Sequence, residues 1–135
     1  MTKAFEILRS ARRVAVLGIR TDASPSAAAY YVPAYLQRAG YDIVPVPVNQ
    51  ADVETILGEP VYRRVADIPG EVDLVVVFRR PADIDGHVDD IIAKSPGAVW
   101  FQLGIRNDDA AARLEAAGID VVQDRCTMID HRRIM

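Results

Sequence analysis

Short apolar runs alternate along this chain with segments in which apolar residues recur every three or four positions. A strand that is buried on both faces of a parallel sheet reads as a continuous run of Val, Ile and Leu, and five runs predict strands on this basis. Pro45 and Pro47 make the second run irregular, because proline removes donors from the hydrogen-bond ladder and is mostly found at sheet edges. The strands are expected at residues 13–18, 42–48, 72–78, 98–103 and 119–122.

Helices are expected between these strands. Residues 2–12 and 27–39 carry apolar residues at helical spacing, and Gly40 ends the second segment as a C-cap. Residues 50–70 contain a short apolar cluster among glycines and prolines, which predicts a short helix and loops leading into the third strand.

Two further helices follow the third and fourth strands. Pro81 suits the first turn of a helix, and Pro96-Gly97 ends that helix. Asn107 is typical of an N-cap, and Gly118 ends the last of these helices near Ala117. The helix that begins at Pro81 has the apolar stripe of a helix packed on a sheet, formed by Ile84, Val88, Ile91 and Ile92.

Strands and helices that alternate at these lengths predict right-handed βαβ crossovers and a parallel sheet with helices on both faces. The expected fold class is therefore α/β, a three-layer Rossmann-like fold with a parallel sheet of about five strands. The chain has 135 residues, enough to bury a substantial core. We expect a single domain over residues 1–135.

Composition and charge narrow the class of protein. Hydrophobic residues make up 50% of the chain and the net charge is -3, which argues against a nucleic-acid binder because such proteins usually carry a basic excess. The lone cysteine, Cys126, excludes an internal disulfide framework and a cysteine-rich metal site. Charged residues are scattered through the N-terminal segment, and no run approaches the roughly 18 apolar residues of a membrane span. We therefore expect a cytoplasmic, unprocessed protein that contacts neither nucleic acid nor membrane.

A buried strand runs directly into two arginines, Arg79 and Arg80, and then into Pro81. Ligands of open α/β sheets bind beyond the carboxyl ends of the strands, and guanidinium groups match phosphate oxygens well. The arginine pair therefore indicates an anionic ligand, with a solvated rim as the alternative interpretation. Neighbouring strand ends are expected to add the polar side chains of Arg20, Thr21 and Asn49.

The loop after the first strand is a second candidate for ligand contact. It begins with Gly18 and leads into a helix N-terminus, where backbone N–H groups and the positive dipole end favour phosphate. A dinucleotide fingerprint would need G-x-G-x-x-G and an acid near the end of the second strand. Gly18 stands alone in this loop, and Asn49 occupies the place of the acid. Both observations count against NAD.

The fourth strand and the tail contain other groups that invite a chemical role. Trp100 and Phe101 are expected in the core, with Gln102 as the functional group of this strand and Gly104 near it at the strand end. Cys126 and His131 lack the third group that a catalytic triad or a zinc site needs, so the tail is expected to be structural or to border the ligand. The remaining histidine, His87, is interpreted as a surface residue of a helix.

Several ordered motifs together resemble the small CoA-binding proteins whose fold is that of the CoA-binding domain of succinyl-CoA synthetase α-subunits. The resemblance covers nearly the whole chain, and its specificity comes from the order of the motifs. They are the strand and glycine loop with Ser and Pro at 24–26, Tyr30-x-Val32-x-x-Tyr35-Leu36, Gly40-Tyr41, Val46-Pro-Val-Asn49, Ile56-Leu57-Gly58, Ala66-Asp-Ile-Pro69, Val77-Phe-Arg-Arg-Pro81, Trp100-x-Gln102-x-Gly104-Ile105 and Asp124-Arg-Cys126.

The resemblance implies that coenzyme A lies across the carboxyl ends of the strands. Two departures affect this expectation: the chain has Ala28-Ala29 where members commonly have Pro-Ser, and Asn49-Gln50 where they commonly have Asn-Pro. Ligand affinity is therefore expected to differ at these two places. The expected ligand-binding residues are Gly18, Ile19, Arg20, Thr21, Ser24, Tyr30, Val48, Asn49, Val77, Phe78, Arg79, Arg80, Gln102 and Gly104.

The function expected from these observations is non-catalytic binding of CoA or an acyl-CoA. One alternative is a subunit of an acyl-CoA ligase or transferase. The resembled synthetases need a phosphorylatable histidine on a further domain, and 135 residues leave no room for that domain, so such a subunit would act with a separate partner. Another is a regulator that responds to CoA or a nucleotide through a protein partner or its own oligomeric state. A mixed disulfide between Cys126 and the CoA thiol is a further hypothesis, which requires an exposed sulfur near the crevice.

Overall fold

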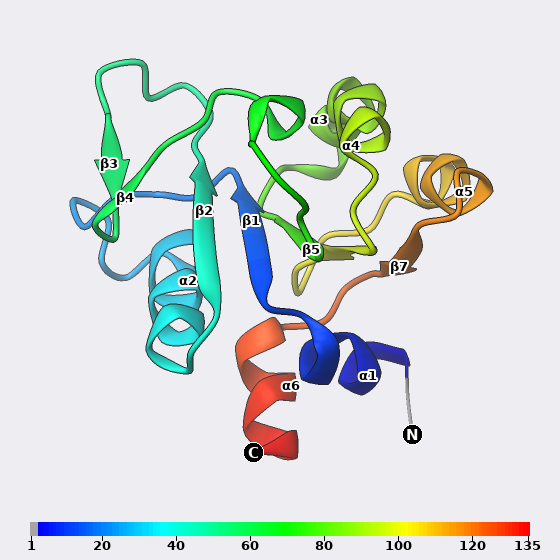
Figure 1. Ribbon diagram of the computed structural model, residues 1–135, viewed down its shortest axis with the longest axis horizontal. Helices are drawn as coiled ribbons and strands as arrows, with labels where there is room; N and C mark the ends of the chain where they lie inside the picture. Colours follow the sequence, from blue (N-terminus) through cyan, green and yellow to red (C-terminus); the bar gives the residue numbers. More distant parts are fainter. Residues whose placement is uncertain (1–2) are drawn as a thin grey trace.

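The computed structural model of the protein, which describes residues 3–135, is built around a five-stranded parallel sheet (Figure 1). The strand order is β2-β1-β5-β6-β7, and every pairing in this sheet is parallel. The α/β class and the five-stranded parallel sheet are thereby confirmed. The strands are β1 Arg13–Leu17, β2 Asp42–Val46, β5 Leu74–Val77, β6 Ala98–Phe101 and β7 Asp120–Val122, each slightly shorter than the sequence predicted.

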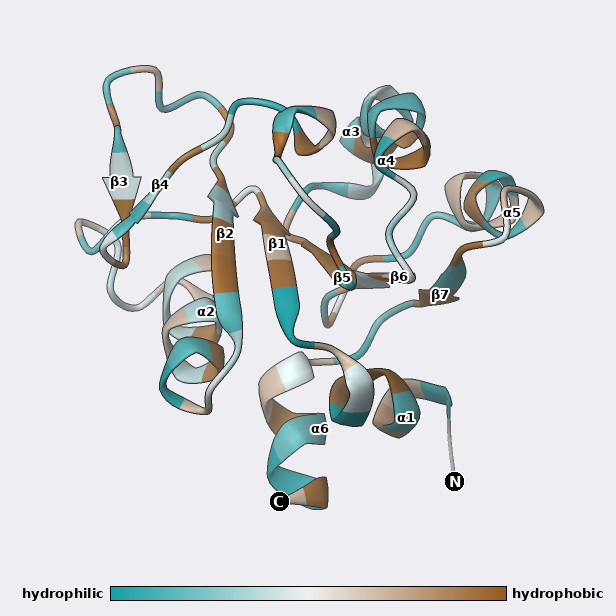
Figure 2. Cartoon of the chain, in the orientation of Figure 1, coloured by the Kyte–Doolittle hydropathy of each residue, from teal (hydrophilic) through white to brown (hydrophobic). Residues whose placement is uncertain are grey.

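Helices cover both faces of the sheet. The side chains of each strand alternate between the two faces, so the sheet separates two apolar cores. Figure 2 shows the apolar residues concentrated on the central strands and on the inward faces of the helices. One face carries α1 Lys3–Ser10, α2 Ala28–Arg38 and α6 Thr127–Ile134, and the other carries α3 Pro81–Ile84, α4 Val88–Lys94 and α5 Asp108–Ala116.

The central strands are sealed from solvent because both of their faces are covered. The four residues of β5 are all fully buried, as their continuous Leu/Val composition predicts. Trp100 and Phe101 lie in the core as expected, and the indole N–H of Trp100 donates a 2.7 Å hydrogen bond to the Arg125 carbonyl. A buried indole thus has its polar atom satisfied.

Local signals placed some helix ends correctly. Asn107 caps α5, its side-chain oxygen accepting a 3.0 Å hydrogen bond from the Ala110 N–H. The helix predicted from Pro81 is interrupted: a 3-10 turn, Asp85–His87, separates α3 from α4. Its apolar stripe nevertheless packs on the sheet, because Ile84, Val88 and Ile91 remain fully buried across the interruption.

The short helix predicted within residues 50–70 is present only as a single 3-10 turn, and the apolar cluster on which the prediction is based is not helical. The chain forms a small hairpin there, with β3 Thr55–Ile56 antiparallel to β4 Glu59–Pro60, followed by a 3-10 turn, Val65–Asp67. The turn residues Leu57 and Gly58 have φ of 54° and 78°, the left-handed pair that a tight two-residue hairpin requires. The apolar cluster in this segment therefore belongs to a hairpin, in which the Ile56 side chain packs on the core.

The final helix, α6, had no counterpart among the predicted elements. It follows Cys126, and its first N–H is satisfied from elsewhere in the chain: Gln102 Oε1 accepts hydrogen bonds from the Thr127 N–H at 3.0 Å and from Thr127 Oγ1 at 2.7 Å. The buried Asp130 carboxylate is paired with Arg125 at 2.6 Å. The position of α6, whose sequence has few apolar residues, is thus set by polar contacts of Thr127 with Gln102 and of Asp130 with Arg125.

The strand order reverses direction at β1. The chain passes from β1 outward to β2 and then returns to place β5 on the other side of β1, which makes the carboxyl ends of β1 and β5 the topological switch point where α/β folds bind ligands. The two strand ends touch here: the Phe78 N–H donates to the Leu17 carbonyl at 2.8 Å. A Cβ atom on Gly18, whose φ is 87°, would lie 2.2 Å from the Phe78 carbonyl oxygen.

Replacing Gly18 by alanine is expected to destabilise the protein through this contact. Gly118→Ala is the matched control, because Gly118 has a φ of 86° with nothing within 4 Å of its Cβ position. The left-handed backbone costs alanine roughly 1–2 kcal/mol in either variant, and the clash at Gly18 should add about 1–3 kcal/mol. Urea unfolding measures the difference, and equal losses in the two variants would contradict the close approach.

Candidate functional site

A cavity of about 600 Å³ opens at the switch point. Four segments enclose it: the loop after β1, the first turn of α2, the residues after β2, and the turn after β5. We call it the switch-point cavity. It is lined by Gly18, Arg20, Ala27, Ala28, Ala29, Val48, Asn49, Gln50, Phe78 and Arg79.

The N-terminus of α2 contributes backbone donors to this cavity. Ala27 is the N-cap residue, and no side chain caps the helix there. The first turn of a helix has N–H groups without intrahelical partners and carries a partial positive charge. Ala28 and Ala29 present this turn to the cavity, and each has a backbone N–H. The Pro-Ser pair expected there from the resemblance would supply only one donor, because proline has no N–H. This end of the cavity is therefore suited to an anion.

The two adjacent arginines point to different surroundings. Arg79 lines the switch-point cavity, and its side chain is 22% exposed. Arg80 has 84% of its side chain exposed, does not line the cavity, and pairs with Asp83 at 2.8 Å. The hydrogen bond from Arg80 lowers the pKa of the Asp83 carboxyl. Consecutive residues at the end of a strand face opposite ways, which separates the pair into a cavity arginine and a surface arginine.

Arg79 is held in place by polar neighbours. Its Nε–H donates to Nε2 of His87 at 3.3 Å, and its terminal Nη2 lies 3.7 Å from the Asp83 carboxylate. Burial is the main cause that lowers the pKa of His87, and the charge of Arg79 adds to the lowering. His87 is thus a partly buried neutral acceptor for Arg79, and its interpretation as a plain surface residue is wrong.

The loop after β1 supplies a second guanidinium. Arg20 is exposed, and its Nη2 donates to Ser24 Oγ at 3.1 Å, while its backbone N–H donates to the Ala29 carbonyl at 3.0 Å. Gln50 ties this loop to the end of β2, because its Nε2 donates to the Ile19 carbonyl at 3.0 Å. Gln50 stands where the resemblance leads us to expect proline, and its side chain therefore connects the first loop to the end of the second strand.

A second cavity, of about 370 Å³, lies between the same loop and the β3–β4 hairpin. Thr21 and Tyr30 line it, together with Asp22 and residues 55–58 of the hairpin. The residues predicted from the sequence are therefore divided. Gly18, Arg20, Val48, Asn49, Phe78 and Arg79 share the switch-point cavity, whereas Thr21 and Tyr30 face the hairpin.

Six predicted residues line neither cavity; two of them, Ser24 and Arg80, are described above, and the other four are placed as follows. The side chains of Ile19 and Val77 are fully buried, so they shape the loop and the strand end from within the core. Gln102 is 3% exposed and its carbonyl oxygen is engaged by Thr127, which gives it a structural role in place of the expected contact. Gly104 lies outside both cavities, and its N–H donates to the Asp124 carboxylate at 2.7 Å.

Sequence reasoning anticipated the helix N-terminus after the glycine loop but did not name Ala27 to Ala29, which form the cavity wall with backbone groups. It missed two further contributors to the site. Gln50 follows Asn49 directly and was visible only as a departure from the family pattern. His87 could not have been found, because its approach to Arg79 depends on the 3-10 turn that interrupts the predicted helix.

The residues at the tail do not form a reactive centre. Cys126 is buried, so the exposed sulfur that a mixed disulfide would require is not present. His131 is engaged through Nδ1 with the Tyr35 hydroxyl at 2.7 Å. Within residues 3–135, no three His, Cys, Asp or Glu side chains are grouped as metal ligands, and no helix is long and apolar enough to cross a membrane.

The chain is similar to several known proteins. The Bacillus subtilis (strain 168) protein YneT is 30% identical over 126 residues, which cover 93% of this chain and 90% of that protein. A solved structure from Thermus thermophilus, termed cell-free ID.343, is 39% identical, with a TM-score of 0.88 over 96% of this chain and 95% of that chain. A dinucleotide-forming acetyl-coenzyme A synthetase from Ca. Korarchaeum cryptofilum shares the fold alone, at 20% identity and a TM-score of 0.65 over 81% of this chain and 25% of that chain.

The match to a family of known sequences is equally extensive. The family described as CoA binding domain matches residues 12–132, a range that includes all five strands of the sheet and every residue that lines the switch-point cavity. The chain therefore belongs to the CoA-binding domain family.

Proposed function

We propose that this protein binds CoA or an acyl-CoA in the switch-point cavity and does so without catalysing a reaction on it. The observation that carries the proposal is the convergence of the uncapped α2 N-terminus with Arg79 and Arg20 around one cavity at the switch point. Phosphate groups are the anions best matched to helix N–H donors and guanidinium groups together. Membership of the CoA-binding domain family supports CoA as the source of those phosphates.

The dimensions of the two adjacent cavities support a ligand of this size. At about 600 and 370 Å³, each falls within the roughly 300–1,000 Å³ of small-molecule sites. The loop from Gly18 to Ser24 separates them, so an extended ligand would have its phosphates at the α2 N-terminus and another part beside Tyr30 and the hairpin. Phe78 is partly exposed at the cavity wall, which makes it suitable for contact with an adenine ring.

A non-catalytic role is supported by the kinds of side chain in the switch-point cavity. Its lining consists of Gly, Ala, Val, Phe, Asn, Gln and Arg residues. Nucleophilic catalysis needs a Ser, Cys, Thr or Lys group beside a base, and the lining contains no such pair. The proposed role is therefore to hold the ligand, as expected for a cytoplasmic carrier or sensor.

A subunit of an acyl-CoA ligase is the second candidate. The fold shared with one quarter of an acetyl-coenzyme A synthetase chain favours it, since a domain of this kind can form part of a larger enzyme. Such a subunit would show acyl-CoA or nucleotide turnover only when a partner is added. A regulator would instead change its oligomeric state or its partner when CoA binds.

Titration calorimetry with CoA tests the site. Arg79→Ala should weaken binding about 10- to 100-fold, because a charge-assisted hydrogen bond contributes roughly 1.5–3 kcal/mol. Arg80→Ala is the matched control: it removes the same charge from the adjacent residue, which is 84% exposed and outside the cavity. Its affinity should stay within about twofold of the parent value, since surface charges contribute little.

Two outcomes would contradict this site. The parent protein could fail to bind CoA, or the two arginine variants could lose affinity equally. Dephospho-CoA and ADP, tested alongside, both keep the 5′-diphosphate of CoA and both lack its 3′-phosphate. If Arg79 contacts the diphosphate, Arg79→Ala should weaken all three ligands; if it contacts the 3′-phosphate, only CoA should be weakened.

His87 is expected to make the stability of the protein depend on pH. Its pKa in the native state is lowered below the ordinary value of 6.5 by burial and by Arg79, against the opposing charges of Asp90 and Asp83. The unfolded chain therefore binds the proton first, and the free energy of unfolding falls as the pH drops below about 6.5 and continues to fall until the lowered native pKa is passed. Above that range the contribution is fully present.

Urea unfolding between pH 5 and 8 measures this effect in the parent protein and in His87→Gln, whose amide oxygen still accepts a hydrogen bond from Arg79. The variant should lose the part of the pH dependence below about 6.5, while carboxylate titration at lower pH stays common to both proteins. Identical pH profiles would show that His87 does not titrate as its surroundings indicate.

A further inference from the structure

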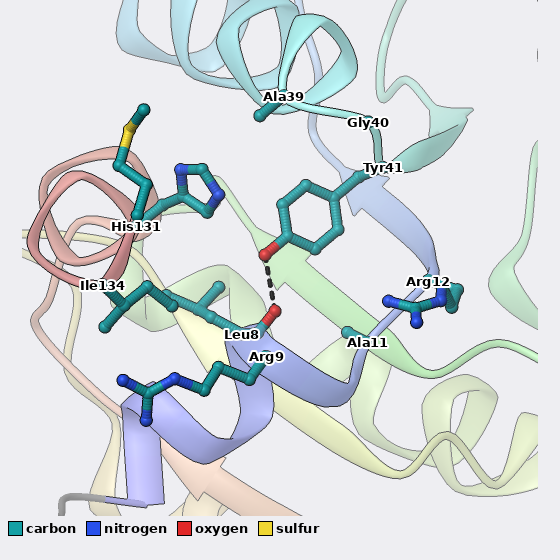
Figure 3. A pocket seen from close by; sticks show the side chains of 10 residues that line it. Leu8, Arg9, Ala11, Arg12, Ala39, Gly40, Tyr41, His131 and Ile134 are labelled. Carbon is teal, nitrogen blue, oxygen red and sulfur yellow. Dashed lines mark hydrogen bonds between the residues drawn. The ribbon is translucent and has the colours of Figure 1, made fainter.

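A groove with cationic and aromatic walls lies at the opposite end of the sheet from the switch-point cavity. The segments that line it precede β1 and β2, at the amino ends of these strands, and come from the last turns of α1, α2 and α6 (Figure 3). It consists of two cavities, of about 270 and 620 Å³, that share Ala39, His131 and Met135. We call it the amino-edge groove. Its other lining residues are Leu8, Arg9, Ala11, Arg12, Tyr35, Arg38, Gly40, Tyr41, Arg132 and Ile134.

The groove gathers arginines that are not paired with acids. Within residues 3–135, the guanidinium groups of Arg12, Arg38 and Arg132 have no carboxylate oxygen within 4.0 Å, although the backbone N–H of Arg12 donates to the Asp73 carboxylate at 2.9 Å. Elsewhere on the surface, the guanidinium groups of Arg64, Arg106 and Arg113 are each paired. Arg20 at the switch-point cavity shares this unpaired state, and its side chain donates to Ser24 instead. Arg63 and Lys94 also have no carboxylate partner in the described part of the chain, but their cationic groups donate to backbone carbonyls. In a chain with net charge -3, the groove thus gathers three guanidinium groups without an acidic partner among the described residues.

Helix dipoles do not account for this accumulation of charge. The last turns of three helices converge on the groove, and each contributes about half a negative charge. Three such ends together carry about 1.5 negative charges, fewer than the positive charges of the four arginines that line the groove. The net potential of the groove is therefore positive, so it attracts anions.

His131 occupies the centre of the groove in a fixed orientation. Its Nδ1 lies 2.7 Å from the Tyr35 hydroxyl, and its ring makes edge contacts with Tyr35 and Tyr41 at centroid distances of 5.5 and 5.7 Å. Figure 3 shows the imidazole extending from α6 across the cavity towards Tyr41, with Arg9 and Arg12 on either side of the Tyr41 hydroxyl. When the Tyr35 hydroxyl donates to Nδ1, the ring proton is on Nε2, which makes that atom a donor within the groove.

The aromatic groups beside His131 carry no negative charge that would repel an anion. Burial, with a smaller contribution from Tyr35, raises the pKa of Tyr41, so this phenol stays neutral. Its hydroxyl donates to the Leu8 carbonyl at 2.6 Å, which satisfies an acceptor at the end of α1. The guanidinium of Arg132 lies over the Tyr35 ring at 5.3 Å. The cationic groups therefore have an apolar, aromatic floor beside them.

From this arrangement we propose that the amino-edge groove binds a small organic anion, with its carboxylate or phosphate group in the cavity that Arg12 and His131 both line and its apolar body in the adjoining cavity, against Tyr35 and Met135. The combined volume of the two cavities lies within the range of small-molecule sites, and the mixture of apolar walls with a few charged groups is their usual character. This site is distinct from the CoA site and does not depend on CoA binding.

The chain offers a separate reporter for each site, because it has two histidines. His87 lies beside the switch-point cavity and His131 lies in the groove. The imidazole NMR resonances of labelled protein can therefore be followed while phenyl phosphate, benzoate, inorganic phosphate and the neutral benzyl alcohol are titrated. Phenyl phosphate or benzoate should shift the His131 resonances to saturation with little change at His87, and the tighter of the two identifies the acid group.

The two remaining probes, inorganic phosphate and benzyl alcohol, test separately how much the charge and the apolar body of the ligand contribute to binding. Inorganic phosphate should bind at least about tenfold more weakly than phenyl phosphate, because it buries no apolar surface. Benzyl alcohol should leave His131 unshifted, because it lacks the charge. The absence of a saturable His131 shift with both organic anions would overturn the proposal, and so would equal affinity for inorganic and phenyl phosphate.

Two substitutions test the residues. Arg12→Met should weaken the organic anion about tenfold or more, since it removes a charge-assisted contact, while Arg106→Met removes a surface arginine outside the groove and should have no effect. Tyr35→Phe removes the hydroxyl that orients His131 and should also weaken binding. An unchanged His87 spectrum establishes that each variant is folded, and equal affinity in Arg12→Met and the parent protein would overturn the assignment.

Discussion

The close approach of β1 to the turn after β5 is the constraint on which the site depends. Gly18 lies so near the Phe78 carbonyl that a single methyl group would collide with it. This contact follows from the strand order, because β1 is the strand from which the chain departs in both directions. With the two strand ends together, the start of α2 and the side chain of Arg79 are brought to the same cavity.

Around that contact, side chains hold the loops of the site in position. Gln50 joins the first loop to the end of β2, and His87 receives the Nε–H of Arg79. Neither residue has a chemistry that sequence motifs single out, yet each one reduces the freedom of a segment that faces the cavity. Preorganisation of this kind lowers the entropic cost of ligand binding, which is consistent with a site designed to hold a ligand.

Positive charge at both ends of the sheet has different origins. At the carboxyl edge it arises from a helix N-terminus together with Arg20 and Arg79. At the amino edge it arises from side chains alone, since the helix ends there carry the opposite sign. The two regions are separated by the sheet itself, so an acidic protein can present two independent surfaces to anions.

By itself, the sequence determined the α/β class, the five buried strands and the position of Arg79 at a strand end, because continuous apolar runs and caps are local signals. It could not distinguish Arg79 from Arg80, since one residue of register decides which side chain faces the cavity. The hairpin at Thr55–Pro60 and the helix α6 also depended on the tertiary structure, because a left-handed turn at Leu57 and the contact of Gln102 with Thr127 stabilise them over local preference. Long-range hydrogen bonds and close backbone approaches join residues far apart in the chain, and no local pattern of residues encodes them.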